Sequence, residues 1–135
     1  MKNRSDNDLL QLREALLELH KILIHHQKRA YEKKHGKLES RHKLYQLVTD
    51  DPEFSWIRQL SELIVSMDEL QDKKSPLSTS QKRDLFKYVR KLLTISRHKT
   101  KFEKEYQHAV QQNPSVTIAH AGVMQALRKM MEEND

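Results

Sequence analysis

Residues 9–24 read LLQLREALLELHKILI, and they carry the strongest structural signal in the chain. Leucines and isoleucines recur there at helical spacing between charged side chains, which is the pattern of an amphipathic α-helix. One apolar stripe recurs every seven residues and continues past this stretch, through Leu10, Leu17, Ile24, Tyr31, Leu38 and Tyr45. A period of seven keeps one side of a helix against another helix. The sequence therefore predicts an all-α protein in which helices pack on helices.

The composition fits one small and highly charged domain. The chain has 135 residues, of which 36% are hydrophobic and 33% are charged, with two glycines and three prolines. A chain of this length ordinarily forms one domain around one core. We expect a single-domain bundle of about five helices over residues 1–135, with a long amphipathic N-terminal helix. Residues 1–6 are expected to be a disordered N-terminus, and residues 72–79 an inter-helix linker.

The end of the first helix is open to two interpretations. Gly36 suits a helix end, because glycine adopts the left-handed C-cap conformation and the basic residues 33–35 favour the last turn. Against this, the seven-residue period stays in phase through Leu38 and Tyr45. A continuous helix from about 7 to 49 would be roughly 63 Å long at 1.5 Å per residue. Such a helix would project from the domain and need a partner chain.

Other boundaries predict the remaining helices. After a helical stretch at about 41–49, Asp50 and Asp51 offer an N-cap, and Pro52 offers the first position of a new helix. The helix over 52–70 carries apolar residues most of the way round, so we expect it to be the central, most buried element. Ser78 or Thr79 is expected to cap the next helix. The last three helices are expected over 80–96, from about 102 to Asn113-Pro114, and over about 116–132. The last of them is expected to place Ile118 among its core residues.

Residues 45–65, YQLVTDDPEFSWIRQLSELIV, resemble a group of small, uncharacterised helical bacterial proteins. The resemblance implies a bacterial, cytosolic origin, and it transfers no functional residue because that group has no known activity. The chain has no cysteine, no secretory signal pattern and no apolar run of membrane-spanning length. We therefore expect a cytoplasmic protein that does not associate with membranes.

The sequence contains no enzyme motif. It lacks a thiolate nucleophile, a glycine-rich phosphate loop and a nucleophile elbow. Ser61 is the only serine deep in an apolar run, and it has no His or Asp within one helical turn to activate it. We expect its hydroxyl to bond a backbone carbonyl one turn earlier. The protein is expected to be non-catalytic and to use no cofactor.

Three Glu-x-x-His pairs offer a metal-binding hypothesis. Two such pairs, with glutamates from two other helices, can hold two metal ions in a four-helix bundle. These glutamates, however, lie about 100° from the apolar stripe, so the competing interpretation is a set of surface pairs and solvated histidines. The metal-ligand candidates are Glu32, His35, Glu39, His42, Glu105 and His108.

Two basic segments offer a nucleic-acid hypothesis. Segment 28–43 and segment 82–104 are rich in Lys and Arg, whereas residues 50–72 carry one basic and seven acidic side chains. Basic faces bind phosphate backbones by releasing counterions, but no recognition motif accompanies them. The competing interpretation is a solvated surface, with Lys82 turned outward among its neighbours. The candidate phosphate contacts are Lys28, Arg29, Lys33, Lys34, Arg83, Lys87, Arg90 and Lys91.

The N-terminal helix provides the leading functional hypothesis. It has more apolar surface than one neighbouring helix covers. We expect the protein to act through protein–protein interaction, as a homodimer or with another helical partner. The interface is expected to use two stripes of the first helix, Leu9, Leu16 and Leu23 on one and Leu10, Leu17 and Ile24 on the other.

Overall fold

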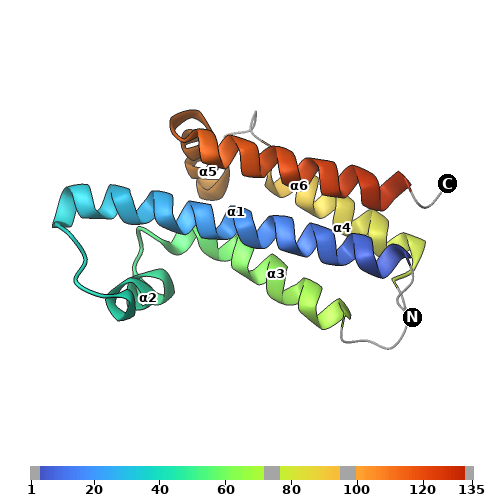
Figure 1. Ribbon diagram of the computed structural model, residues 1–135, viewed down its shortest axis with the longest axis horizontal. Coiled ribbons are helices and arrows are strands. Elements are labelled where there is room, and N and C mark those ends of the chain that lie inside the picture. Colours follow the sequence, from blue (N-terminus) through green and yellow to red (C-terminus); the bar gives the residue numbers. More distant parts are fainter. Residues whose placement is uncertain (1–3, 72–76, 95–99, 133–135) are drawn as a thin grey trace.

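The computed structural model describes residues 4–71, 77–94 and 100–132, and these ranges contain six α-helices, one short 3₁₀ helix and no strand (Figure 1). The all-α prediction is confirmed. The elements are α1 (Arg4–His35), α2 (Arg41–Asp50), η1 (Ser55–Ile57), α3 (Arg58–Gln71), α4 (Thr79–Leu92), α5 (Lys101–Gln112) and α6 (Pro114–Glu132). Within the described ranges, no helix carries an apolar stretch of the length that crossing a membrane requires.

The two segments expected to be irregular lie partly outside the described residues. Residues 4–6 belong to α1 rather than to a disordered N-terminus, while residues 1–3 are not described. Residues 72–76 of the expected linker are not described either, and Leu77 and Ser78 lead directly into α4.

The central helix is α1, which runs between α3 on one side and α6 on the other (Figure 1). Its buried face carries five leucines that are 0–3% exposed: Leu9, Leu12, Leu16, Leu19 and Leu23. The expectation that residues 52–70 form the central helix is wrong, since Val65 of α3 is 56% exposed. The reason is geometric, because α3 has 14 residues and packs mainly against α1 and η1. By contrast, α1 and α6, with 32 and 19 residues, pack against each other and against further elements.

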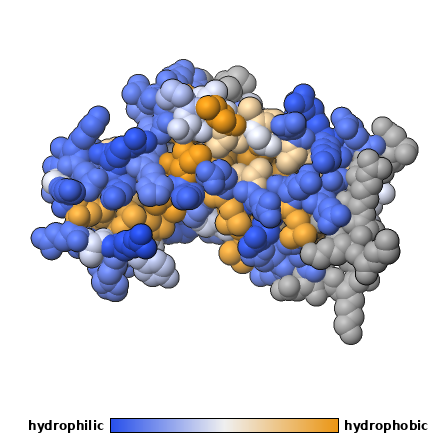
Figure 2. Space-filling model, in the orientation of Figure 1, coloured by the Kyte–Doolittle hydropathy of each residue, from blue (hydrophilic) through white to orange (hydrophobic). Residues whose placement is uncertain are grey.

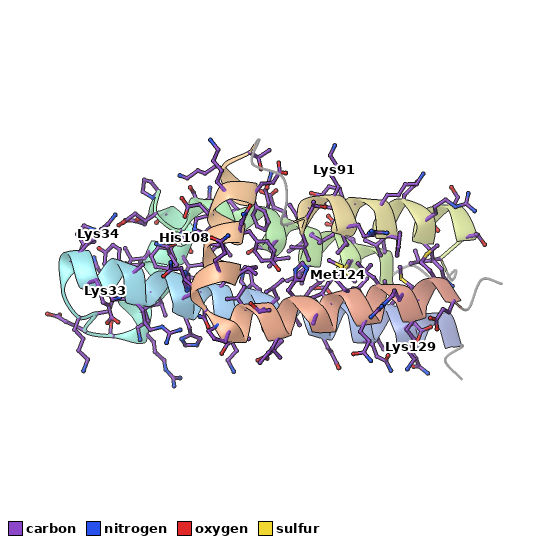
Figure 3. The ribbon with its side chains drawn as sticks, turned by 90° about the horizontal axis from the view of Figure 1, so that it is seen from above. Lys33, Lys34, Lys91, His108, Met124 and Lys129 are labelled. Carbon is purple, nitrogen blue, oxygen red and sulfur yellow. The ribbon has the colours of Figure 1, made fainter. Side chains whose placement is uncertain are left out.

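Aromatic side chains close the core where α5 crosses the start of α6 (Figures 1 and 3). The rings of Trp56 and Phe102 lie 5.7 Å apart, and those of Phe102 and Tyr106 are stacked at 5.4 Å. The Tyr106 hydroxyl lies 2.7 Å from His120 Nδ1. This hydrogen bond lets a buried tyrosine keep its polar end satisfied while it joins α5 to α6.

Gly36 ends α1, so the continuous-helix alternative is wrong. Its φ angle is +89°, and its N–H donates to the Glu32 carbonyl at 2.9 Å. Glu32 Oε2 accepts a further hydrogen bond from Leu38 N at 2.8 Å, which turns the chain away from the helix axis. Ser40 then caps α2 by accepting from Lys43 N.

The chain after α2 forms a turn before α3 begins, although a helix starting at Pro52 was expected. Asp51 Oδ1 accepts a hydrogen bond from Glu53 N at 2.8 Å, which forms a local Asx turn. Hydrogen bonds between residues three apart follow. In one of them, Ile57 N donates to the Phe54 carbonyl at 3.1 Å. These bonds produce the tighter 3₁₀ helix η1, and so α3 begins only at Arg58.

Two later helices begin with capping boxes. Ser78, one of the two residues expected to cap α4, forms a capping box with Gln81. Thr100 forms a capping box with Glu103 at the start of α5. The structure describes α4 only to Leu92, followed by a turn, so it is shorter than the expected 80–96, of which residues 95 and 96 are not described.

Two side chains face the opposite way from the expectation. Lys82 is only 4% exposed, because it lies on the face of α4 that also carries Leu85 and Val89. Ile118, which was expected in the core, is 72% exposed. It follows the buried Val116 by two residues, which places it on nearly the opposite side of α6.

Candidate functional site

Half of the expected interface belongs to the core of this chain. Leu9, Leu16 and Leu23 are 3%, 0% and 0% exposed. They face the surrounding helices of the same molecule, so the expectation that they contact a partner is wrong. The two stripes were indistinguishable in sequence because both repeat every seven residues, and only the position of the neighbouring helices separates them.

The second stripe remains at the surface, beside α3. Leu17 is 36% exposed, and Leu10 and Ile24 are partly buried. We call these three residues, together with Val65 of α3, the apolar seam. Figure 2 shows separate hydrophobic patches among hydrophilic side chains on the face of the molecule seen in Figure 1.

Two polar contacts fix the register of α1 and α3 along the apolar seam. The Arg13 guanidinium pairs with the Asp68 carboxylate, and His20 Nε2 lies 2.6 Å from Ser61 Oγ. Because these contacts show that the helices run antiparallel, Leu17, midway between Arg13 and His20 on α1, lies level with Val65. The two exposed apolar side chains therefore lie at the same height on two helices that pack together.

The Ser61 contact differs from the expectation that its hydroxyl bonds its own helix backbone. Its partner, His20, comes from another helix, so sequence proximity gave no signal for it. Burial lowers the pKa of His20, which favours the neutral ring. A serine beside a histidine is also an arrangement used in nucleophilic catalysis, but neither residue lines the cleft described next.

A cleft of about 550 Å³ lies between the C-terminal third of α1 and the corner where α5 meets α6. Figure 3 shows Lys33 and Lys34 near the end of α1 and His108 on α5, in the same half of the molecule. The lining combines cationic, imidazole and amide side chains with one indole ring. Its residues are His26, Gln27, Arg29, Ala30, Lys33, Lys34, Trp56, Glu105, His108, Gln112, Asn113 and Pro114.

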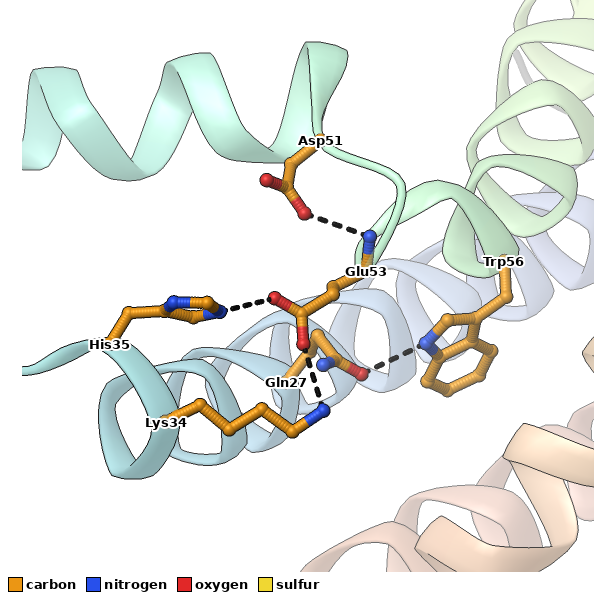
Figure 4. Close-up of polar contacts among 6 residues, drawn as sticks. All are labelled: Gln27, Lys34, His35, Asp51, Glu53 and Trp56. Carbon is orange, nitrogen blue, oxygen red and sulfur yellow. Dashed lines mark hydrogen bonds and ion pairs between the residues drawn. The ribbon is translucent and has the colours of Figure 1, made fainter.

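An ionic clamp supports one wall of the cleft (Figure 4). Glu53 accepts a hydrogen bond from Lys34 Nζ at 3.2 Å and lies 2.9 Å from His35 Nε2. Burial raises the pKa of the Glu53 carboxyl, but hydrogen bonds from Lys34 and His35 outweigh burial, so the net pKa is lowered. The clamp ties the turn after α2 to the last turn of α1.

Trp56 forms another part of the wall, and it is the only tryptophan in the chain. Its Nε1–H donates to Gln27 Oε1 at 2.9 Å (Figure 4). Since Gln27 belongs to α1 and Trp56 to η1, this bond fixes the indole ring at the base of the cleft.

His26 connects the two sides of the cleft. Its Nδ1 lies 3.4 Å from Asn113 Nδ2, at the junction of α5 and α6. Burial lowers the pKa of His26, and the positive charges of Arg29 and Lys33 lower it further, while Glu105 raises it. The net lowering favours a neutral His26 at neutral pH.

The first two Glu-x-x-His motifs bond other residues rather than their own partners. Glu32 bonds the Leu38 N–H, and His35 contacts Glu53. His42 lies 3.3 Å from Gln46 of its own helix, and Glu39 is exposed. His35, Glu39 and His42 line one surface pocket, but among the described residues neither glutamate forms an ion pair with the histidine of its own motif.

The third pair, Glu105 and His108, does line the cleft, near His26. Nevertheless, in the part of the chain that the structure describes, no group of three or more His, Asp or Glu side chains is arranged to hold a metal ion. The four-helix metal site therefore receives no support from the geometry.

The basic residues of α4 and those at the end of α1 lie in different halves of the molecule (Figures 1 and 3). Arg29, Lys33 and Lys34 border the cleft, and Lys28 is partly buried beside them. The basic residues of α4 lie in the half occupied by the N-terminal part of α1, where they are exposed; they are Arg83, Lys87, Arg90 and Lys91. The structure does not unite the eight candidate phosphate contacts into one surface.

Comparison with protein-family models, with curated proteins and with solved structures finds no match for this chain.

Proposed function

We propose that the protein is a non-catalytic helical interaction protein that associates with a second copy of itself through the apolar seam. The supporting observation is that Leu17 and Val65, which are 36% and 56% exposed, lie at the same height on two helices that pack together. Exposed apolar side chains that form one surface favour association, because burial removes them from water.

The spacing along α1 suits a two-fold symmetric contact. Leu17 lies seven residues from Leu10 and seven from Ile24, or about 10 Å in each direction along the helix. If two copies of α1 cross antiparallel about a two-fold axis at Leu17, each Leu10 faces Ile24 of the second copy. Such an interface is isologous, because one patch meets the same patch of the partner.

The charges beside the apolar seam fit the same arrangement. Glu14 and Lys21 are both exposed, on opposite sides of Leu17 along the helix. The two-fold axis brings Glu14 of each copy close to Lys21 of the other, giving two opposite-charge pairs. Exposed pairs contribute only about 0.2–1 kcal/mol each, so they favour the antiparallel register more than they strengthen the dimer.

The decisive measurement is the molecular mass in solution by sedimentation analysis over a concentration series. We expect a reversible dimer for the unmodified chain and a monomer for Leu17→Glu, because a carboxylate would be buried at the two-fold axis. The matched control is Ile118→Glu, which introduces the same charge at an exposed apolar position on α6 and should leave the dimer intact. A monomer of the unmodified chain at every concentration would disprove the proposal.

A charge exchange tests the register itself. Glu14→Lys and Lys21→Glu should each weaken the dimer, since each variant places like charges opposite one another. The double variant restores opposite pairs and should recover the affinity. With two pairs per dimer, each single variant should raise the Kd by roughly twofold to thirtyfold. Additive weakening in the double variant would contradict the antiparallel register.

Nucleic-acid binding and metal binding stay predictions from the sequence. No contact described above favours either of them over self-association. We infer protein–protein association as the main activity because the apolar seam alone combines exposure, symmetry and complementary charge.

A further inference from the structure

The cleft beside α1 has the dimensions of a small-molecule site and lies apart from the apolar seam. Its volume of about 550 Å³ falls within the roughly 300–1,000 Å³ of typical ligand pockets. Two elements distant in sequence form its walls, the end of α1 and the corner between α5 and α6. The Glu53 clamp and the bond between Trp56 and Gln27 hold these walls in place.

The charge on the cleft is positive. Arg29, Lys33 and Lys34 oppose the single carboxylate of Glu105. Lys34 is held by Glu53, but among the residues that the structure describes neither Arg29 nor Lys33 forms an ion pair. Because Arg29 and Lys33 are four residues apart, their side chains project from the same side of α1.

Side chains supply this positive charge, and the start of α6 adds little hydrogen-bonding capacity. Asn113 Oδ1 already accepts from Ser115 N at 3.0 Å, and Pro114 has no N–H. Away from the cations, the wall contains the exposed residues Ala30 and Pro114 together with the small accessible part of Trp56, which is 5% exposed. These residues offer an apolar surface. The cleft thus has one cationic part and one part suited to an organic group.

We propose that this cleft binds a phosphorylated small molecule, whose phosphate group lies between Arg29 and Lys33 and whose organic part lies against Trp56. A phosphate monoester carries a charge of about −1.5 to −2 at pH 7, which matches two neighbouring cations. Guanidinium groups recognise phosphate oxygens through paired hydrogen bonds. Gln112 and Glu105 can bond hydroxyl groups of the organic part.

The single tryptophan gives a direct measurement, because its indole N–H produces one NMR signal. Thymidine monophosphate, titrated at constant ionic strength, should shift this signal until it saturates. Removing both cations with the double variant Arg29→Gln and Lys33→Gln should weaken binding about tenfold or more. Lys91→Gln removes one positive charge from α4, in the other half of the molecule, and should leave the affinity unchanged. Binding that does not saturate, or that the double variant retains in full, would overturn the proposal.

A second arm separates a phosphorylated small molecule from a nucleic-acid backbone, which presents the same phosphate chemistry. The mononucleotide is compared with a short oligothymidylate at two salt concentrations. Similar affinities support the small-molecule assignment. An affinity that rises with strand length and falls steeply with salt would overturn it in favour of nucleic acid. Leu17→Glu should not change either titration, so failure of the cleft proposal and failure of the dimer proposal can be told apart.

Discussion

The two ends of α1 share one helix but have different surroundings. From Leu9 to Leu23, the helix lies between α3 and α6, and its inward leucines are at most 3% exposed. From His26 to His35, one side borders the cleft, and Lys33 and Lys34 are exposed. The apolar period marks the helix in both parts, but burial depends on where the neighbouring helices end.

The seven-residue stripe also shows that burial depends on the neighbouring helices and not on the apolar period. It runs through Leu17, Tyr31 and Tyr45, yet these residues share no common surroundings. Leu17 is 36% exposed beside α3, and Tyr45 is 72% exposed on α2. The ring of Tyr31 is tilted against that of His35, with ring centroids 4.3 Å apart. The seven-residue period that continues past Gly36 has no structural role, because the chain turns at Gly36 and α1 ends.

The largest expected effect comes from the buried part of α1. Leu16→Ala should lower the free energy of unfolding by about 2–5 kcal/mol, since Leu16 is 0% exposed and the substitution leaves a cavity. Leu17→Ala is the matched control, because it makes the same change one residue later, at a partly exposed side chain. It should cost less than about half as much.

Urea denaturation at a low protein concentration, at which a dimer would dissociate, measures both variants. Equal losses for Leu16→Ala and Leu17→Ala would contradict the assignment of the two stripes to the core and the surface.

A smaller effect is expected where α1 ends. Gly36→Ala should cost about 1–2 kcal/mol, because an L-residue is strained at a φ of +89°. A Cβ at this position meets nothing within 4 Å, so the cost is backbone strain alone. Gly122→Ala is the control, since Gly122 lies within α6 and a Cβ there also meets nothing within 4 Å.

The control should stabilise the protein by roughly 0.5–1 kcal/mol, through the better helix propensity of alanine. Thermal denaturation followed by circular dichroism compares the two variants. A gain in stability and in helical signal for Gly36→Ala would mean that α1 can continue into α2.

The smallest expected effect is the response to acid, which compares His20 in the middle of α1 with His120 on α6. Burial lowers the pKa of both histidines below the ordinary value of 6.5. At pH values between the lowered pKa values and about 6.5, the unfolded chain therefore binds more protons than the folded chain. Stability should be full above pH 6.5 and should fall as the pH drops towards the lowered pKa values.

Urea midpoints measured across this pH range test the sign of the effect. His20→Gln and His120→Gln remove one titrating group each and should reduce the slope. Urea midpoints that do not change with pH would contradict the burial of neutral histidines. A pH dependence that is the same in the variants and the unmodified chain would contradict it as well.

Local chemistry made most of the secondary structure predictable. Ser78 was recognised as a possible cap because its hydroxyl bonds a backbone N–H only three residues away, and Gly36 because its conformation depends on its own backbone. The predicted start of this helix at Pro52 was wrong, because the Asx turn at Asp51 forms instead and α3 begins only at Arg58. Lys82 was expected to be exposed because its charge outweighed its position on the apolar face of α4.

The candidate sites were less predictable than the helices. The basic residues of the cleft and the leucines of the apolar seam stand out in the sequence. Their grouping does not follow from the sequence, because Trp56 and His108 lie far from Arg29 along the chain. The contact between His20 and Ser61 was missed for the same reason, because no local pattern relates two residues on separate helices.

The amino-acid sequence by itself determined that this chain folds into amphipathic helices, and where most of them begin and end. Hydrogen bonds and periodic burial within a few residues suffice for that. Only the tertiary structure decided that α1 is central, that Leu16 is buried while Leu17 is exposed, and that the end of α1 borders a cationic cleft. These features depend on which helices pack side by side, and the burial of one stripe over another follows from contacts between residues far apart in the chain.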